Sequence, residues 1–163
     1  MLFRSLAGEL AAASLAAVLA GASSPLPQDE SKVSYARRLA RTDAPLDFRR
    51  SARELSRRVL ALEGWPGSTF EHRGAPIKVG GAAAEETPVS APPGTVLRAD
   101  RGGVKVACGQ GVLVLTQLQR PGGKMLPAAE FLAGYPLAVG EALGSAEMPD
   151  FVADRPFPRA PKA

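Results

Sequence analysis

The stretch that decides the fold is residues 65–131, and its centre, residues 93–118, reads PGTVLRADRGGVKVACGQGVLVLTQL. Valines two positions apart, such as Val104 and Val106, follow the period of a strand that buries one face. Turn signals that contain glycine separate the apolar runs, at Pro93-Gly94 and at Gly102-Gly103. The pattern predicts short strands joined by tight turns rather than a helical bundle.

Outward from this centre, the sequence predicts five strands and two hairpins. We expect strands near residues 68–72, 76–80, 94–100, 103–108 and 111–118, with hairpin turns at Arg73-Gly74 and Arg101-Gly102-Gly103. Residues 81–92, which are mostly Ala, Glu, Thr, Ser and Pro, are predicted to form a flexible loop. Five short strands with glycine corners favour an OB-like barrel, which leaves few open edges because the sheet curls on itself. The predicted fold class is therefore mainly β with short helices, an OB-like small β-barrel preceded by a linker and an N-terminal helix.

The clearest predicted helix is residues 52–62. Ser51 is a favourable N-cap, and Glu54 completes a capping box. One face of this helix is apolar, and a second face carries arginines: Arg50, Arg53 and Arg57. Arginine suits phosphate because its planar guanidinium binds two oxygens at once. The helix therefore presents either a phosphate-facing row of cations or a solvated surface.

The flanking segments divide the chain into four parts. The first two are an apolar, Ala-rich helix in residues 1–22 and a linker in residues 23–47. The third is the barrel domain in residues 48–143, which includes a short helix at 127–133 and an extended piece at 135–143. The fourth is a Pro-rich tail in residues 144–163, which we expect to be disordered. The first part also imitates a secretory signal, with Arg4 before an apolar run and Ala20-Gly21-Ala22 after it, although Glu9 interrupts the run. Its uncharged piece is too short to span a membrane comfortably, so we expect no membrane segment.

Charge is distributed unevenly along the 163 residues. The whole chain has a formal net charge of +4, but residues 32–63 alone hold nine Lys or Arg against four acidic residues. A local basic segment is typical of a phosphate-facing surface.

One cysteine excludes an internal disulfide framework, and one histidine argues against a histidine-based metal site. Cys108 is expected to be a buried small hydrophobe. Because no catalytic triad or phosphate-binding loop is present, these features favour a binding module over a catalyst.

Several segments together resemble the C-terminal half of methionyl-tRNA formyltransferases, over about residues 6–143. The segments that carry the resemblance are, in order, Pro27-Gln28-Asp29-Glu30 and Ser34-Tyr35-Ala36 in the linker, residues 52–59 in the helix, Trp65-Pro66-Gly67, Pro93-Gly94-Thr95-Val96-Leu97, residues 106–111, Leu118-Gln119 and residues 124–134. No single motif decides the match, but their order and spacing agree with the family. The resemblance implies that residues 1–22 are the last helix of a preceding catalytic domain rather than a signal peptide.

The resemblance implies a tRNA-binding role. In that family the OB-like domain and the linker help bind initiator Met-tRNA, so this tRNA is the implied partner, a catalytic formyltransferase domain is the second, and we expect a cytoplasmic monomer. No cofactor is expected in this chain, whereas 10-formyltetrahydrofolate is the co-substrate of the full-length family. The implied tRNA-binding residues are Lys32, Arg38, Arg53, Arg57, Arg58, Lys78 and Lys124. For each of them the alternative is a solvated surface cation.

The chain also departs from the family pattern. Nothing matches the family's catalytic Asn, His and Asp or its folate-site segment, so we expect this chain alone not to transfer a formyl group. It is then a truncated product or one with a mis-assigned start. Leu60 and Gly123 stand where cations are usual, which predicts weaker tRNA binding.

Three alternatives stay open at this point. The first is that the domain is a packing module of another formyltransferase-like enzyme. The second is that the chain is a small exported protein with a cleaved leader. For Trp65 the choice lies between a platform that stacks a base and a core anchor. Its place between Gly64 and Pro66 at a helix end favours the anchor.

Overall fold

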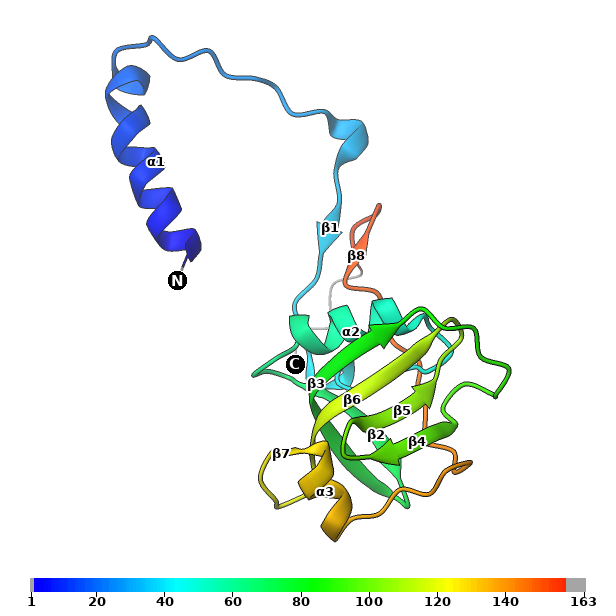
Figure 1. The fold of residues 1–163 in the computed structure, drawn as a ribbon. Coiled ribbons are helices and arrows are strands. Elements are labelled where there is room, and N and C mark those ends of the chain that lie inside the picture. The colour runs from blue at the N-terminus through cyan, green and yellow to red at the C-terminus, as the bar shows by residue number, and fades with distance from the viewer. Residues whose placement is uncertain (1, 158–163) are drawn as a thin grey trace, which may run out of the picture.

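The computed structural model describes residues 2–157 and consists of an N-terminal helix, a linker and a curled antiparallel sheet with two further helices (Figure 1). The N-terminal part contains α1 (Leu2–Leu19), a 3₁₀ turn at Glu30–Lys32, β1 (Tyr35–Ala36) and a second 3₁₀ turn at Arg41–Asp43. The barrel is built from α2 (Ala52–Ala61), β2 (Ser68–His72), β3 (Ala75–Glu85), β4 (Val96–Asp100), β5 (Gly103–Ala107), β6 (Val112–Gln119), β7 (Leu126–Pro127) and α3 (Ala128–Gly134). A last short strand, β8 (Val152–Ala153), follows the barrel.

The sheet curls into a nearly closed barrel. Its strands are hydrogen-bonded in the order β2-β3-β6-β5-β4, each pair is antiparallel, and β7 pairs with β6. The segment after α3 joins the two edges of this sheet. On one side the Gly144 amide donates to the Glu71 carbonyl of β2, with N and O 2.6 Å apart. On the other side the Leu143 amide donates to the Gly94 carbonyl, just before β4, at 2.9 Å. The closure confirms the predicted fold class, mainly β with an OB-like barrel.

Alternating side chains of the central strands fill the barrel. Val104 and Val106 of β5 are fully buried, as predicted from their spacing. Helix α2 lies across one end of the barrel (Figure 1) and buries Leu55 and Val59 against the same core. The Ser51 hydroxyl accepts a hydrogen bond from the Glu54 amide at 3.2 Å, so the predicted N-cap of this helix is confirmed.

Strand β3 is longer than the sequence predicted. It runs to Glu85, so residues 81–85 of the expected loop 81–92 are paired with β6 instead. The pairing register shifts at Gly80-Gly81, where a Cβ on Gly81 would lie only 2.6 Å from the Thr116 hydroxyl. Glycine therefore permits a bulge that bends the strand around the barrel. The Ala-rich sequence hid the strand because alanine has a low strand propensity.

The expectation of a disordered tail in residues 144–163 is corrected for the part that the structure describes. Strand β8 pairs antiparallel with β1 of the linker. Met148 is buried, with 3% of its surface exposed, and the Ala146 amide donates to the Leu46 carbonyl at 3.2 Å. The tail thus runs back along the barrel and the linker. Residues 158–163 lie outside the described residues.

Helix α1 agrees with the helix expected in residues 2–20. It lies apart from the barrel at the end of an extended segment (Figure 1), and its side chains from Phe3 to Leu19 are exposed, apart from the half-buried Ser14. Within residues 2–157, no helix has the length and apolar character needed to cross a membrane.

Candidate nucleic-acid interface

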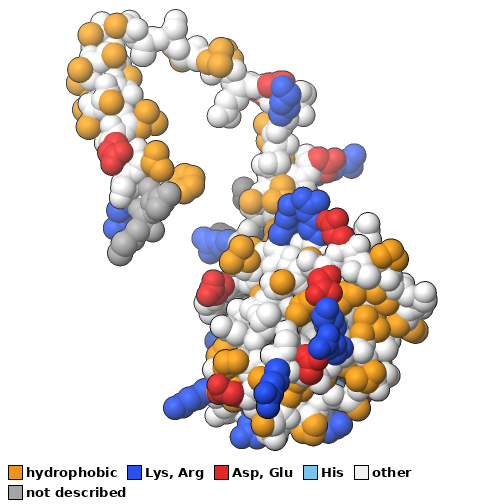
Figure 2. All heavy atoms as spheres, viewed as in Figure 1, with side chains coloured by type: hydrophobic (Ala, Val, Ile, Leu, Met, Phe, Trp, Pro, Cys, Tyr) orange, Lys and Arg blue, Asp and Glu red, His pale blue; other side chains and the backbone are white. Residues whose placement is uncertain are grey.

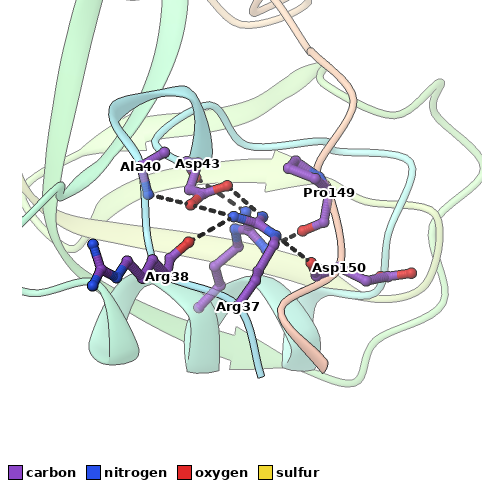
Figure 3. Close-up of polar contacts among 7 residues, drawn as sticks. Arg37, Arg38, Ala40, Asp43, Pro149 and Asp150 are labelled. Atoms are coloured by element: carbon purple, nitrogen blue, oxygen red, sulfur yellow. Dashed lines mark hydrogen bonds and ion pairs between the residues drawn. The ribbon is translucent and has the colours of Figure 1, made fainter. Parts of the chain in front are cut away.

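Arg37 of the linker forms the centre of a polar clamp (Figure 3). Its two terminal nitrogens donate to both carboxylate oxygens of Asp43, at 2.6 and 3.0 Å. Its Nε donates to the backbone carbonyl of Asp150 in the tail at 2.8 Å. Asp43 is fully buried, and the hydrogen bonds from Arg37 hold the pKa of its carboxyl below the usual range. Arg37 therefore joins the linker to the tail, and its charge is neutralised.

Arg58 belongs to the same clamp, and its predicted role on tRNA is corrected. Only 9% of its surface is exposed, and its Nη2 donates to the Asp43 carbonyl at 3.0 Å. Its guanidinium lies 4.1 Å from the ring centroid of Phe151, while that of Arg37 lies 5.3 Å from the same ring. Burial lowers the pKa of Arg58, which is the direction expected for a cation removed from water. A side chain enclosed in this way does not reach a phosphate.

Two further predicted cations and two neighbouring arginines form ion pairs. Lys32 lies 3.2 Å from Asp29 in an exposed pair, and Arg53 lies 4.0 Å from Glu86. Arg49 donates to Asp47, whose carboxyl pKa is lowered chiefly by these hydrogen bonds. Arg50 is 3.8 Å from Glu54. Exposed pairs of this kind add little to stability and open readily, so Lys32 and Arg53 stay available to a partner.

Four of the predicted cations are exposed and, within residues 2–157, have no acidic partner: Arg38, Arg57, Lys78 and Lys124. Arg57 lies on the outer side of α2, and Arg38 follows β1 in the linker. Lys78 projects from β3 beside the end of α2, and Lys124 precedes β7. The structure thus leaves these four charges unpaired on the surface.

A hollow beside Lys78 reveals two cations that the sequence reasoning did not select. It has a volume of about 480 Å³ and is lined by Arg41, Trp65, Lys78 and Arg120, together with backbone and small side chains and without any acidic residue. Lys78 also lines an adjoining hollow of about 240 Å³. Arg120 and Lys124 line another of about 250 Å³. We call Arg41, Lys78, Arg120 and Lys124 the basic strip, because shared lining residues connect these hollows.

The sequence held a signal for both missed cations. Arg41 belongs to the basic segment 32–63, and Arg120 directly follows a predicted strand. Trp65 also differs from its favoured interpretation, because 54% of its surface is exposed. It is not a core anchor. Leu62, three residues earlier, is fully buried and anchors the end of α2 in its place.

Charges on β4, on β5 and at the end of β3 are paired, in contrast to the basic strip. Figure 2 shows Lys and Arg side chains lying beside acidic ones over the viewed face of the barrel. Lys105 of β5 contacts both oxygens of Glu85 on β3 at 2.7 and 2.8 Å. Arg98 of β4 pairs with Asp100. Neighbouring charges of opposite sign cancel at a distance, so the paired surface attracts a polyanion less than the strip does.

His72 is part of a buried polar cluster rather than a catalytic group. Only 3% of its surface is exposed. Its Nδ1 lies 2.9 Å from the Tyr135 hydroxyl, and its Nε2 lies 2.8 Å from a carboxylate oxygen of Glu141. Hydrogen bonds from the Ala138 amide and from His72 lower the pKa of Glu141 to about 2. Each polar end of the imidazole faces a protein group, as buried histidines require.

Cys108 has the environment expected of an inert thiol. It is buried, and burial raises its pKa to about 11. Within residues 2–157, no three or more His, Cys, Asp or Glu side chains are grouped so as to hold a metal ion. The described surface therefore offers charge and an exposed aromatic ring for binding.

Comparison with known families defines the class of the protein. Residues 38–136 match the family described as formyl transferase, C-terminal domain. The match covers the linker end, α2, the barrel strands and α3. The chain belongs to this family.

Three curated relatives are all methionyl-tRNA formyltransferases, which is one particular kind of formyltransferase. A methionyl-tRNA formyltransferase of Burkholderia thailandensis is 45% identical over 122 residues, which are 75% of this chain and 37% of that protein. Those of Paraburkholderia phymatum and Burkholderia pseudomallei are 46% and 44% identical over 116 and 127 residues. The chain thus resembles methionyl-tRNA formyltransferases closely, yet spans little more than a third of their length.

Solved structures agree on the fold. A variant of HypX from Aquifex aeolicus aligns with a TM-score of 0.55 at 21% identity, covering 82% of this chain and 24% of that one. HypX in complex with tetrahydrofolic acid aligns with a TM-score of 0.53 at 22% identity, covering 87% and 25%. At this identity the likeness concerns the fold alone.

Proposed function

We propose that this chain is the C-terminal, tRNA-binding part of a methionyl-tRNA formyltransferase and that it holds initiator Met-tRNA for N-formylation in the cytoplasm at the start of translation. The carrying observation is the basic strip, four exposed cations without acidic partners in the described chain. Lys and Arg side chains bind nucleic acid by neutralising phosphates and releasing their counterions. The identity of the curated relatives supports initiator Met-tRNA as the particular partner.

The remaining predicted cations enlarge the proposed contact. Lys32 and Arg38 lie in the linker, and Arg53 and Arg57 lie on the exposed side of α2. A tRNA is larger than the basic strip. A tRNA bound to the strip can therefore also contact these four side chains of the linker and of α2. Arg58 is excluded from the set because it is buried.

The chemistry of formyl transfer is proposed to lie outside this chain. The donor, 10-formyltetrahydrofolate, belongs to the family's activity, and one solved structural neighbour is a complex with tetrahydrofolic acid. His72 is enclosed in a buried polar cluster, and Cys108 lines a hollow of about 540 Å³ but is buried, which raises the pKa of its thiol to about 11, so neither is placed to act as an acid, base or nucleophile. A catalytic formyltransferase domain is therefore the second proposed partner, and the chain acts as a monomer in binding.

The experiment that tests this function is a binding titration of initiator Met-tRNA with wild-type protein and with the double variant Lys78→Glu/Lys124→Glu. Both residues are exposed, so folding should survive, which circular dichroism checks. Reversal of two phosphate-facing charges should weaken binding by at least about tenfold, since each lost charged contact is worth on the order of 1 kcal/mol.

A matched control is Arg101→Glu. Arg101 is an exposed arginine in the turn between β4 and β5, and it lines none of the three hollows of the basic strip. Its reversal changes the net charge in the same direction and should leave affinity nearly unchanged. Because the control reverses one charge and the double variant reverses two, a control loss of about half the double variant's loss in binding free energy would show that only net charge matters. Unchanged affinity in both would favour the packing-module alternative.

A further inference from the structure

We propose that the hollow beside Trp65 is a subsite for one unpaired RNA nucleobase, which stacks on the indole ring while its neighbouring phosphates contact Arg41, Lys78 and Arg120. We call this hollow the Trp65 subsite. The inference rests on the proposed function only in taking RNA as the partner. It adds a contact to the base itself, which the basic strip does not provide.

The indole is presented to solvent by a short, anchored turn. Helix α2 ends at Ala61, and the buried Leu62 fixes the chain at this point. The Gly67 amide donates to the Leu62 carbonyl at 2.9 Å, which closes the turn around Trp65. A turn held at both ends orders the backbone of the exposed ring, so stacking on it costs less conformational entropy than stacking on a mobile loop.

The chemistry of the lining matches a nucleotide. Trp65 supplies an aromatic face, 54% exposed, and the cations Arg41, Lys78 and Arg120 surround the same hollow. No acidic residue lines this hollow, whereas Glu63 and Glu130 each line one of the two adjoining hollows, so the positive charge is most concentrated beside Trp65. Aromatic side chains within a positively charged groove are the usual means by which proteins hold single-stranded nucleic acid without reading its sequence.

The dimensions agree with a small ligand. A volume of about 480 Å³ lies in the lower half of the roughly 300–1,000 Å³ range of small-molecule sites. The hollow continues past Lys78 and Arg120 into the neighbouring hollows of the basic strip. A strand of RNA can therefore leave the Trp65 subsite along the strip, with its phosphates near successive cations.

The decisive experiment uses the protein's own fluorescence, because Trp65 is the single tryptophan of the chain. The whole chain is titrated at low salt with a decamer of riboadenosine and with a decamer of the same backbone that lacks bases. The labelled 3′ end of each decamer reports binding independently. We expect the decamer with bases to quench Trp65 and the abasic decamer to bind without quenching.

Variants give a second readout. Trp65→Ala should weaken the decamer with bases roughly 5- to 150-fold and should leave the abasic decamer within about twofold of wild type. Trp65→Phe, which keeps an aromatic face, should lose less affinity than Trp65→Leu, which keeps only apolar bulk. Since Trp65 is exposed, these variants should unfold at nearly the same urea concentration as wild type.

The outcomes separate this inference from the proposed function. If Lys78→Glu/Lys124→Glu weakens tRNA binding while Trp65 is neither quenched nor sensitive to substitution, the subsite is overturned and the tRNA-binding role stands. If wild type binds no RNA at all, both are overturned. If Trp65 fluorescence responds only to a separately produced catalytic domain of a relative, the hollow is a protein interface, and the subsite is overturned.

Discussion

Glu141, at the closed edge of the barrel, contributes to how the stability of the fold depends on pH. Glu141 faces the buried His72, and its pKa of about 2 lies below the ordinary value of 4.5. A carboxylate whose pKa is depressed by folding stabilises the fold above its unfolded pKa and loses that stabilisation as pH falls through its folded pKa. The contribution of Glu141 is therefore complete above about pH 4.5 and declines toward pH 2.

The corresponding variant is Glu141→Gln. It should be less stable than wild type at pH 7, and the difference in free energy of unfolding should shrink between about pH 4.5 and pH 2. Urea unfolding at several pH values measures this difference. The comparison must be made between the two proteins, because Asp43 and Asp47 also have lowered pKa values and contribute to acid unfolding in both. Parallel stability profiles for the two proteins would contradict the role assigned to Glu141.

At the scale of single residues, Arg58 shows both the reach and the limit of sequence reasoning. The helix around it was predicted correctly, but Arg58 itself was expected to be an exposed cation that binds tRNA, and it is buried. The partners that bury it are Asp43 and Phe151, which lie 15 residues before and 93 residues after it in the chain. No local sequence pattern could indicate that the ring of Phe151, so distant in sequence, packs against Arg58.

Among elements, those stabilised locally were predicted and those stabilised by distant contacts were missed. The Ser51 N-cap of α2 and the glycine turns of the hairpins act within a few residues, and both are present in the structure. The end of β3 exists because it pairs with β6, about 30 residues away. Strand β8 forms because it pairs with β1 of the linker, and because the ring of Phe151, just before β8, lies against the guanidinium of Arg37. The basic strip likewise combines Arg41 and Arg120, which only the folded chain brings together.

The tail element should act as a strap on the linker, and Phe151→Ala tests this. Its ring contacts the guanidinium groups of both Arg37 and Arg58, and each such contact is worth about 0.5–1 kcal/mol. Removal should lower the free energy of unfolding by about 1–2 kcal/mol. Hydrogen exchange should also accelerate at the Arg37 amide, which donates to the Phe151 carbonyl at 3.1 Å. Both effects should be seen together.

The matched control for the strap is Val152→Ala, at the next residue, where β8 begins. Val152 is 56% exposed, so its truncation removes little buried surface. It should leave both the stability and the exchange rate close to wild type. Equal effects from the two substitutions would mean that backbone pairing between β1 and β8, and not the arginine contacts, holds the tail.

For the whole molecule, the proposed function makes a quantitative statement about salt. If all four residues of the basic strip contact phosphates, the logarithm of the tRNA association constant should fall against the logarithm of salt concentration with a slope of about −2.8 to −3.6, since each contact contributes about 0.7–0.9. The variant Lys78→Glu/Lys124→Glu removes two contacts, so its slope should be shallower by about 1.4–1.8. Trp65→Ala removes stacking and no charge, so it should weaken binding at every salt concentration and leave the slope unchanged. Titrations at several salt concentrations measure all three slopes.

A wild-type slope near zero would mean that the strip does not face the RNA backbone, whereas a slope far steeper than −4 would assign additional phosphates to Arg38 and Arg57.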